Sequence, residues 1–232
     1  MIGIAASSFT PLTSFRLWLD ASDGEAGVRR KEGTSEFQLW IDKSGNRNHA
    51  MLDAQDPIMD TTTDPTRPFM RFPSIYCALR LSNRLLLRRS NAVTFFAVLW
   101  LGVDDQGSVL TSSGMTHGSH LYYSGAFIET IGFSNTLGQR INIPSPFGSE
   151  RWFLFALRAD AANKVRVYNS STVPFHVSTE IFSLNFVNRL YTLLSVRGRV
   201  AELLVHATTM TDTEFETTMT DLMTKWNVPP PL

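Results

Sequence analysis

The chain has 232 residues, of which 43% are hydrophobic and 18% are charged. This length fits one large β-domain or two small domains, and the apolar fraction is sufficient for a sizeable core. The 21 basic and 21 acidic residues cancel, so the net charge favours neither nucleic acid nor an anionic membrane as a partner. No stretch approaches the ~20 consecutive apolar residues of a membrane-spanning helix. The single cysteine, Cys77, excludes an intrachain disulfide.

Short apolar or alternating segments, separated by turn-forming residues, make up most of the chain. This pattern is typical of a β-sandwich or jelly roll. In chain order, the expected strands cover residues 15–19, 37–41, 69–72, 76–79, 93–101, 107–111, 120–123, 126–132, 140–143, 152–158, 164–169, 189–195 and 199–206. The segments 95–100 and 152–157 are continuously apolar, which suits strands that are covered on both faces.

The segment 40–50, with the sequence WIDKSGNRNHA, follows the second expected strand and is rich in turn-forming residues. Asp and Asn side chains can hydrogen-bond the nearby backbone, and Gly45 and Asn46 tolerate positive φ, so we expect a tight loop. Calcium binds roughly six to eight oxygens, and this loop offers some of them together with one upstream residue: Asp42, Ser44, Asn46, Asn48 and Asp20. Because the loop itself holds a single carboxylate, a structural turn is the favoured interpretation and a calcium site is the alternative.

One segment near the C-terminus departs from the β pattern. Thr211 and Glu214 have the spacing of a capping box. Apolar residues then recur on one helical face, namely Phe215, Met219, Leu222, Met223 and Trp226. The prolines at 229–231 prevent continuation. The sequence therefore predicts an amphipathic helix over about 211–226 that packs on the sandwich.

Two pairs of motifs at the ends of the chain resemble the concanavalin A-like (LamG-like) jelly-roll family. LWLDAS at 17–22 and the 40–50 loop are similar to its opening, and VAELLVH at 200–206 with the helix ending in KWNV at 225–228 is similar to its closing segment. The resemblance implies an all-β sandwich of two antiparallel sheets with one C-terminal amphipathic helix. It implies a single domain over 15–228, with an N-terminal arm at 1–14 and a Pro-rich tail at 229–232.

Family members are binding or adhesive modules in bacterial surface proteins, carbohydrate-binding or carbohydrate-active proteins, and phage or viral structural proteins, and the fold alone does not choose among these. Related glucanases carry a Glu-x-Asp-x-x-Glu arrangement on one strand, which is absent here. Glycoside hydrolysis needs two carboxylates that flank the scissile bond. Glu129 and Glu202 are single acids on expected strands, and we expect them to face solvent. We therefore do not expect an enzyme.

Sugar binding requires exposed aromatic rings beside polar groups. The candidate ligand-binding residues lie in or next to expected loops: Tyr122, Tyr123, Phe133 and Phe147. Core packing is the alternative role for each of these rings. A separate tripeptide, N-S-S at 169–171, is a formal N-glycosylation sequon that matters only in a secreted protein.

The N-terminal residues 1–8 lack the basic region and the long apolar run of a signal peptide. A jelly roll made in the cytoplasm without an export signal favours a component of a phage or viral particle that mediates attachment or decoration. The expected partners are other virion proteins and host-surface glycans, in a homo-oligomer or larger assembly. The alternatives are a lectin that is soluble in the cytoplasm or outside the cell and, more weakly, a glycan-active enzyme.

Overall fold

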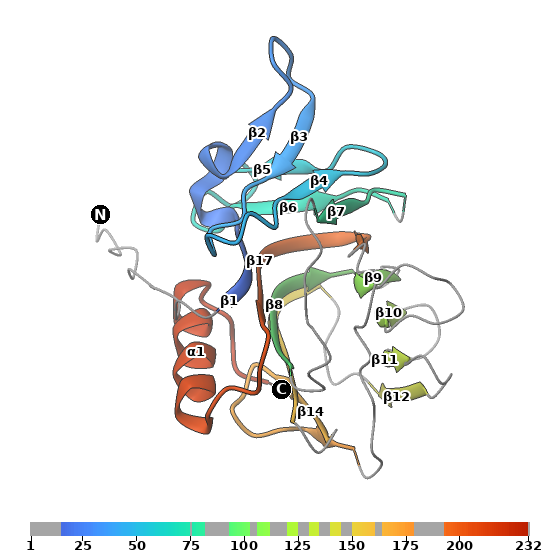
Figure 1. Ribbon diagram of the computed structural model, residues 1–232, viewed down its shortest axis with the longest axis vertical. Helices are drawn as coiled ribbons and strands as arrows, with labels where there is room; N and C mark the ends of the chain where they lie inside the picture. The colour runs from blue at the N-terminus through green and yellow to red at the C-terminus, as the bar shows by residue number, and fades with distance from the viewer. Residues whose placement is uncertain are drawn as a thin grey trace.

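The computed structural model describes residues 15–74, 76–81, 93–102, 106–111, 120–124, 130–134, 140–144, 150–160, 164–178 and 193–231. Within these residues the chain forms two sheets and one α-helix near the C-terminus, and all pairs between strands are antiparallel (Figure 1). The expected all-β sandwich of two antiparallel sheets is therefore confirmed. No helix in this part of the chain is long and apolar enough to span a bilayer.

The first sheet is built around the long strand β17. In spatial order its strands are β15 (His176–Val177), β14 (Val165–Asn169), β13 (Arg151–Ala159), β8 (Val93–Leu101), β17 (Gly198–His206), β6 (Phe69–Phe72) and β5 (Ile58–Asp60). The first strand, β1 (Phe15–Asp20), also pairs with β17. The N-terminal and C-terminal motifs of the sequence are thus neighbours in space.

The second sheet contains the remaining described strands. In spatial order they are β12 (Arg140–Pro144), β11 (Thr130–Ser134), β10 (His120–Ser124), β9 (Gln106–Thr111), β16 (Leu193–Val196), β7 (Leu79–Leu81), β4 (Ala50–Leu52), β3 (Phe37–Trp40) and β2 (Val28–Arg30). A short 3-10 segment, η1 (Ala21–Gly27), connects β1 of the first sheet to β2 of the second.

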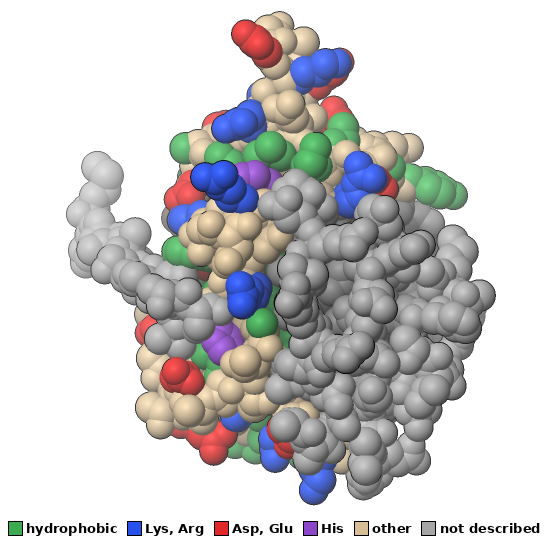
Figure 2. Space-filling model, in the orientation of Figure 1, with side chains coloured by type: hydrophobic (Ala, Val, Ile, Leu, Met, Phe, Trp, Pro, Cys, Tyr) green, Lys and Arg blue, Asp and Glu red, His purple; other side chains and the backbone are tan. Residues whose placement is uncertain are grey.

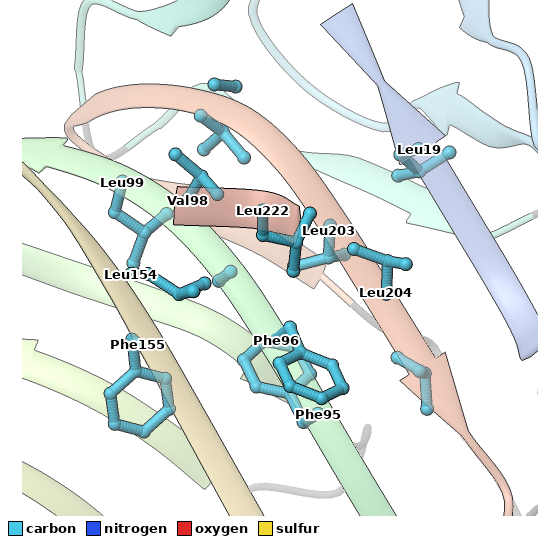
Figure 3. Close-up of a cluster of buried hydrophobic side chains, with 14 of the residues drawn as sticks. Leu19, Phe95, Phe96, Val98, Leu99, Leu154, Phe155, Leu203, Leu204 and Leu222 are labelled. Carbon is cyan, nitrogen blue, oxygen red and sulfur yellow. The ribbon is translucent and has the colours of Figure 1, made fainter. Parts of the chain in front are cut away.

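The two central strands of the first sheet are buried on both faces, as their continuous apolar sequences predict. In β8, Phe95 and Phe96 are at most 3% exposed although they point to opposite faces. Phe95 packs against Phe155 on the face toward the second sheet, with ring centroids 6.0 Å apart. Phe96 packs against Phe215 of the C-terminal helix on the other face. Phe95, Phe96 and Phe155 belong to the cluster of buried side chains drawn in Figure 3. Complete burial of both faces therefore depends on the sheet and the helix together.

The helix, α1 (Asp212–Lys225), covers the outer face of the first sheet (Figure 1). The predicted capping box is confirmed, since the Glu214 backbone N–H donates to the Thr211 hydroxyl while the Glu214 carboxylate accepts from the Thr211 backbone N–H. Phe215 stacks on Phe96 at 5.3 Å and contacts Tyr168 at 4.4 Å between ring centroids. The apolar stripe is what attaches the helix to the sheet.

Several strand boundaries differ from the prediction. The strand expected at 76–79 is β7 at Leu79–Leu81, and the strand expected at 126–132 is described only as β11 at Thr130–Ser134. The strands β2, β4, β5 and β15 were not predicted, because segments of two or three residues are too short to show a period. The expected arm at 1–14 lies outside the described residues.

Charges on the described surface are mixed in sign. Figure 2 shows basic and acidic side chains interspersed around the β2–β3 end of the molecule. Exposed ion pairs occur there, between Arg30 and Glu25 at 2.7 Å and between Lys31 and Glu36 at 3.2 Å. This distribution agrees with the zero net charge of the chain.

Candidate functional site

The loop between β3 and β4 is organised around the carboxylate of Asp42. Its Oδ1 accepts hydrogen bonds from the backbone N–H groups of Trp18 and Ser44, both at 2.9 Å. Its Oδ2 accepts from the Ser44 hydroxyl and from the Asn48 backbone N–H, both at 2.8 Å. A carboxylate that accepts four such bonds closes the loop on itself and ties it to β1.

The other predicted oxygen ligands of this loop bind the backbone of β1. Asn46 Nδ2 donates to the carbonyl of Phe15 at 2.8 Å, and Asn48 Nδ2 donates to that of Arg16 at 2.7 Å. Positive φ occurs at Gly45, as expected, and at Arg47 rather than at Asn46. These are the contacts of the structural turn that the sequence favoured.

Calcium remains an untested alternative for this loop. Within the described ranges, no group of three or more His, Cys, Asp or Glu side chains is arranged to hold a metal ion.

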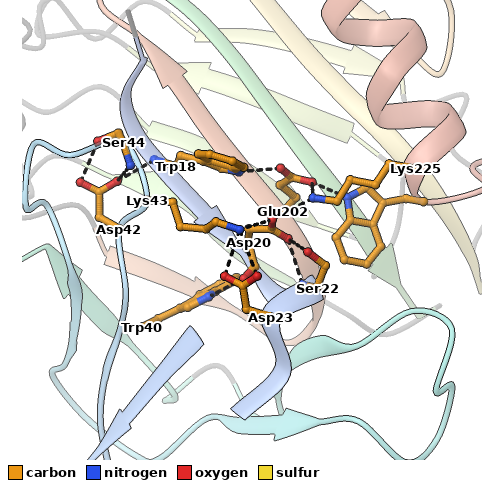
Figure 4. Close-up of polar contacts among 11 residues, drawn as sticks. Trp18, Asp20, Ser22, Asp23, Trp40, Asp42, Lys43, Ser44, Glu202 and Lys225 are labelled. Carbon is orange, nitrogen blue, oxygen red and sulfur yellow. Dashed lines mark hydrogen bonds and ion pairs between the residues drawn. The ribbon is translucent and has the colours of Figure 1, made fainter. Parts of the chain in front are cut away.

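Asp20, the remaining candidate calcium ligand, belongs to a partly buried group of charges between β1, β17 and α1 (Figure 4). We call this group the acid–lysine cluster and define it as Asp20, Asp23, Lys43, Glu202 and Lys225. Asp20 and Glu202 are directly opposite each other in β1 and β17, and both are at most 1% exposed. Lys225 Nζ lies 2.8 Å from a carboxylate oxygen of each. Lys43 Nζ bridges Asp20 at 3.0 Å and Asp23 at 2.9 Å.

Three tryptophans complete the hydrogen bonding of the cluster. Trp18 Nε1 donates to Glu202 Oε1 at 2.7 Å, and Trp226 Nε1 donates to Glu202 Oε2. Trp40 Nε1 donates to the carbonyl of Asp20 at 3.3 Å. Buried carboxylates are tolerated only when such donors replace water. All three tryptophans lie in the end motifs of the sequence.

Burial and neighbouring charges move the pKa values of Glu202 and Asp20 in opposite directions. Burial raises the pKa of Glu202 to about 7, and the negative charge of Asp20 adds to this, while Lys225 and the indole donor of Trp226 oppose it. For Asp20, burial acts to raise the pKa. The charge of Lys225, its hydrogen bond and those from Ser22 outweigh that effect, so the pKa of Asp20 is lowered.

The expectation that Glu202 faces solvent is wrong. Its strand position lies on the outer face of the first sheet, and α1 covers this face. Glu129 lies outside the described residues. The buried Asp20–Glu202 pair lacks access for a saccharide, so the arrangement joins β1, β17, the 40–50 loop and α1 rather than flanking a scissile bond. Sequence reasoning did not connect Lys43 or Lys225 to these acids, although both lie in the end motifs.

The side chains of the predicted ligand-binding aromatics lie outside what the structure describes. Phe147 is outside the described residues, and for Tyr122, Tyr123 and Phe133 only the strand backbone is described. Their binding role stays a prediction. The strand register nevertheless shows which face of the second sheet each position occupies.

Tyr122 occupies the outer face of the second sheet. Leu79 of β7 is fully buried in the core and pairs with Leu194 of β16. Because successive strand positions alternate between faces, Ser195 is on the opposite, outer face. Ser195 pairs with Ser108, and Ser108 pairs with Tyr122. The position of Tyr122 is therefore on the side away from the core.

The register separates the two adjacent tyrosines. Tyr122 pairs with Gly132, and Gly132 pairs with Asn142. The neighbouring positions on this outer face are mostly polar: His120, Ser124, Thr130, Ser134, Arg140 and Pro144. The positions on the inner face are all apolar: Leu121, Tyr123, Ile131, Phe133, Ile141 and Ile143. By this register, positions 122 and 123 belong to opposite faces of the sheet.

The formal glycosylation sequon is inaccessible in the folded chain. Asn169 is 2% exposed, at the end of β14. An enzyme that modifies the folded protein could not reach its amide.

No family model and no curated protein matches the sequence. Solved structures do match the fold. One is a structure of botulinum neurotoxin type C, whose cell entry is described as dependent on interaction with two ganglioside molecules. It matches with a TM-score of 0.61 and 11% identity, over 90% of this chain and 51% of that chain. The serotype D binding domain has a TM-score of 0.60 and 9% identity, covering 91% of this chain and 51% of that one.

The receptor-binding domain of the C/D mosaic serotype matches with a TM-score of 0.58 and 12% identity over 94% of this chain and 55% of that chain. Likeness at these identities shows a shared β-sandwich fold and nothing of the ligand. This chain spans about half the length of the chains that it matches.

Proposed function

We propose that this protein is a non-catalytic carbohydrate-binding module that serves attachment or decoration in a phage or viral particle. The observation that carries the binding function is the outer-face row of the second sheet, in which the Tyr122 position lies between Gly132 and Ser108. A tyrosine supplies an aromatic ring of the kind that stacks on sugars, and the polar residue types at the neighbouring register positions suit sugar hydroxyls. Protein sites for small ligands combine these two features.

A non-catalytic role is supported by the partly buried acid–lysine cluster and by the structural neighbours. Glu202 and Asp20, the two acids brought together on β17 and β1, are paired with Lys225, Asp20 also with Lys43, and both are buried under α1. The matched solved structures are described as binding domains of toxins.

A glycan array followed by calorimetric titration tests the binding function. Tyr122→Ala should abolish binding to the glycans that the wild-type chain retains. Tyr123→Phe is the matched control, because position 123 is on the inner face and the substitution keeps the ring. Unchanged binding by Tyr122→Ala, or no glycan retained by the wild-type chain, would refute the proposal.

A role in attachment or decoration of a phage or viral particle is supported by the family resemblance of the end motifs. Mass spectrometry and electron microscopy of purified particles from cells that produce this chain test it. The chain should be present at a fixed copy number relative to the main shell or tail protein. Its absence from every particle would leave the lectin as the surviving function.

A further inference from the structure

A row of three large side chains crosses the outer face of the first sheet beyond α1. Arg71 of β6 pairs with Arg199 of β17, and Arg199 pairs with Trp100 of β8. These strands lie side by side in Figure 1. We call Arg71, Arg199 and Trp100 the arginine row. None of the three was singled out by the sequence, because they lie 29 or more positions apart in the chain.

Aromatic rings hold one of the two guanidinium groups in place. The Arg199 guanidinium carbon lies 4.0 Å from the ring centroid of Trp100 and 5.0 Å from that of Phe69. The Phe69 ring is itself packed against Trp152, with centroids 5.8 Å apart. Cation–π contact with Trp100 and Phe69 orients Arg199 without using its N–H donors.

The two arginines have no acidic partner in the described part of the chain. Like charges directly opposite each other on neighbouring strands destabilise a sheet. Neither Arg71 nor Arg199 makes a hydrogen bond or ion pair with any described residue. By contrast, Arg30 and Arg158 are each paired with a carboxylate, at 2.7 and 2.6 Å.

The acid on the adjacent strand β5, Asp60, is already hydrogen-bonded to neighbouring threonines. Asp60 pairs with Phe69 in the register, and its carboxylate accepts hydrogen bonds from the backbone and hydroxyl groups of Thr62 and Thr63. Ile58, on β5 with Asp60, pairs with Arg71 of β6 and is 41% exposed. The exposed Ile58 thus lies at a register position next to Arg71, which in turn pairs with Arg199.

We propose that the arginine row binds the anionic group of an acidic saccharide, a carboxylate or a sulfate ester. This proposal rests on the carbohydrate-binding function proposed above and names its ligand class. Arg71 and Arg199 form fork-like hydrogen bonds to the anion. Ile58 contacts the sugar ring, and Trp100 acts as a positioning residue for Arg199. The anion relieves the repulsion between two unpaired like charges.

Isothermal titration of the purified full chain at low salt tests the proposal. The probes are tetragalacturonate, its neutral methyl ester, and a sulfated heparin tetrasaccharide. We expect at least one acidic probe to bind, with affinity that falls as salt rises. The methyl ester keeps the same rings and loses the charge, so it should bind at least about 10-fold more weakly.

Arg71→Gln should weaken binding of the acidic probe by about 10- to 100-fold, the range of a lost charge-assisted interaction. Arg71 is exposed, so this variant should fold. Without ligand, its melting temperature should equal or exceed that of the wild-type chain, because one repulsion is removed. Arg29→Gln, an equal charge change at an exposed position of β2, should leave binding unchanged. Arg199→Gln provides the second test of the row.

Binding of the acidic probes that is unaffected by Arg71→Gln and Arg199→Gln would overturn the inference, as would the absence of binding by any acidic probe. The proposed function has a separate readout. If neutral glycans bind in a Tyr122-dependent manner while the arginine variants bind every probe as the wild-type chain does, the carbohydrate-binding function is supported and the role of the arginine row is refuted. If acidic probes bind through Arg71 and Tyr122→Ala leaves glycan binding unchanged, the arginine row is supported and the outer-face tyrosine site is refuted.

Discussion

Replacing Glu202 by Gln should remove a specific pH dependence from the stability of the fold. In the folded chain the pKa of Glu202 is raised from 4.5 to about 7, chiefly by burial. Asp20 and Lys225 are the charged groups that contact it from β1 and α1, with Lys43 bound to Asp20 behind them. Gln has the same size as Glu and does not ionise.

The sign of the effect follows from the raised pKa. Below about pH 4.5 the carboxyl of Glu202 is protonated in both the folded and the unfolded chain, so its contribution to stability is fully present. Between about 4.5 and 7 the unfolded chain has released the proton while the folded chain retains it, so stability falls as pH rises. The difference between these two pKa values corresponds to about 3 kcal/mol of unfolding free energy, all of it lost above about pH 7.

Asp20 acts in the opposite sense and in a lower pH range. Its pKa is lowered in the folded chain, so its contribution is present above its usual value of 3.8 and is lost as pH falls. The two carboxylates together therefore favour mildly acidic conditions, near pH 4.5–5.

Urea unfolding at pH 5 and pH 8 measures the effect. The wild-type chain should lose about 2.5 kcal/mol more than Glu202→Gln between the two pH values, equivalent to roughly 5–10 °C in melting temperature for a chain of this size. Glu216→Gln, at an exposed position of α1, controls for titration of the rest of the molecule. Equal pH dependence of stability in the wild-type chain and Glu202→Gln would show that the pKa of Glu202 is not raised in the folded chain.

Further predictions concern the same framework. Lys225→Met should destabilise the fold by about 3–5 kcal/mol in urea titrations, because it leaves the buried Glu202 without its cation and Asp20 with Lys43 alone. Adding Glu202→Gln should recover part of the loss, and an effect below about 1 kcal/mol would contradict a buried role for the lysine. Asp42→Ala should cost at least about 2 kcal/mol, since the backbone N–H groups that it caps lose their acceptor, and an unchanged midpoint would show that the loop closes without it. Thr211→Ala should cost about 1 kcal/mol through loss of the helix cap, read by thermal melting. Treatment with EDTA should shift the melting temperature by less than about 1 °C, because only a ligand of the folded state changes stability; a larger drop that is restored by calcium would support the calcium alternative.

Local sequence patterns were sufficient for much of the fold. The apolar sequence of β8 predicts a strand covered on both faces, and its bounds, Val93–Leu101, agree with the expectation. The helix α1 also agrees, because its cap and its apolar stripe are local properties. Short edge strands such as β15 have two residues, and their pairing depends on a neighbour rather than on their own sequence.

The environment of the charged residues was decided by tertiary structure. A single acid on a strand, such as Glu202, gives no local sign of burial, because its cover comes from Lys225 and Trp226 on another element. The face of a strand residue is also a register property, so adjacent positions such as Tyr122 and Tyr123 are separated only once β10 is paired.

The sequence by itself determined which segments are strands or helix and that the 40–50 loop is a turn, because periodicity and side-chain-to-backbone hydrogen bonds act over a few residues. Only the tertiary structure brought Asp20 and Glu202 into contact, across 182 positions of the chain, and placed Arg71 beside Arg199. Charge–charge energies depend on distance and burial, and neither quantity exists for these residues until the sheets are assembled.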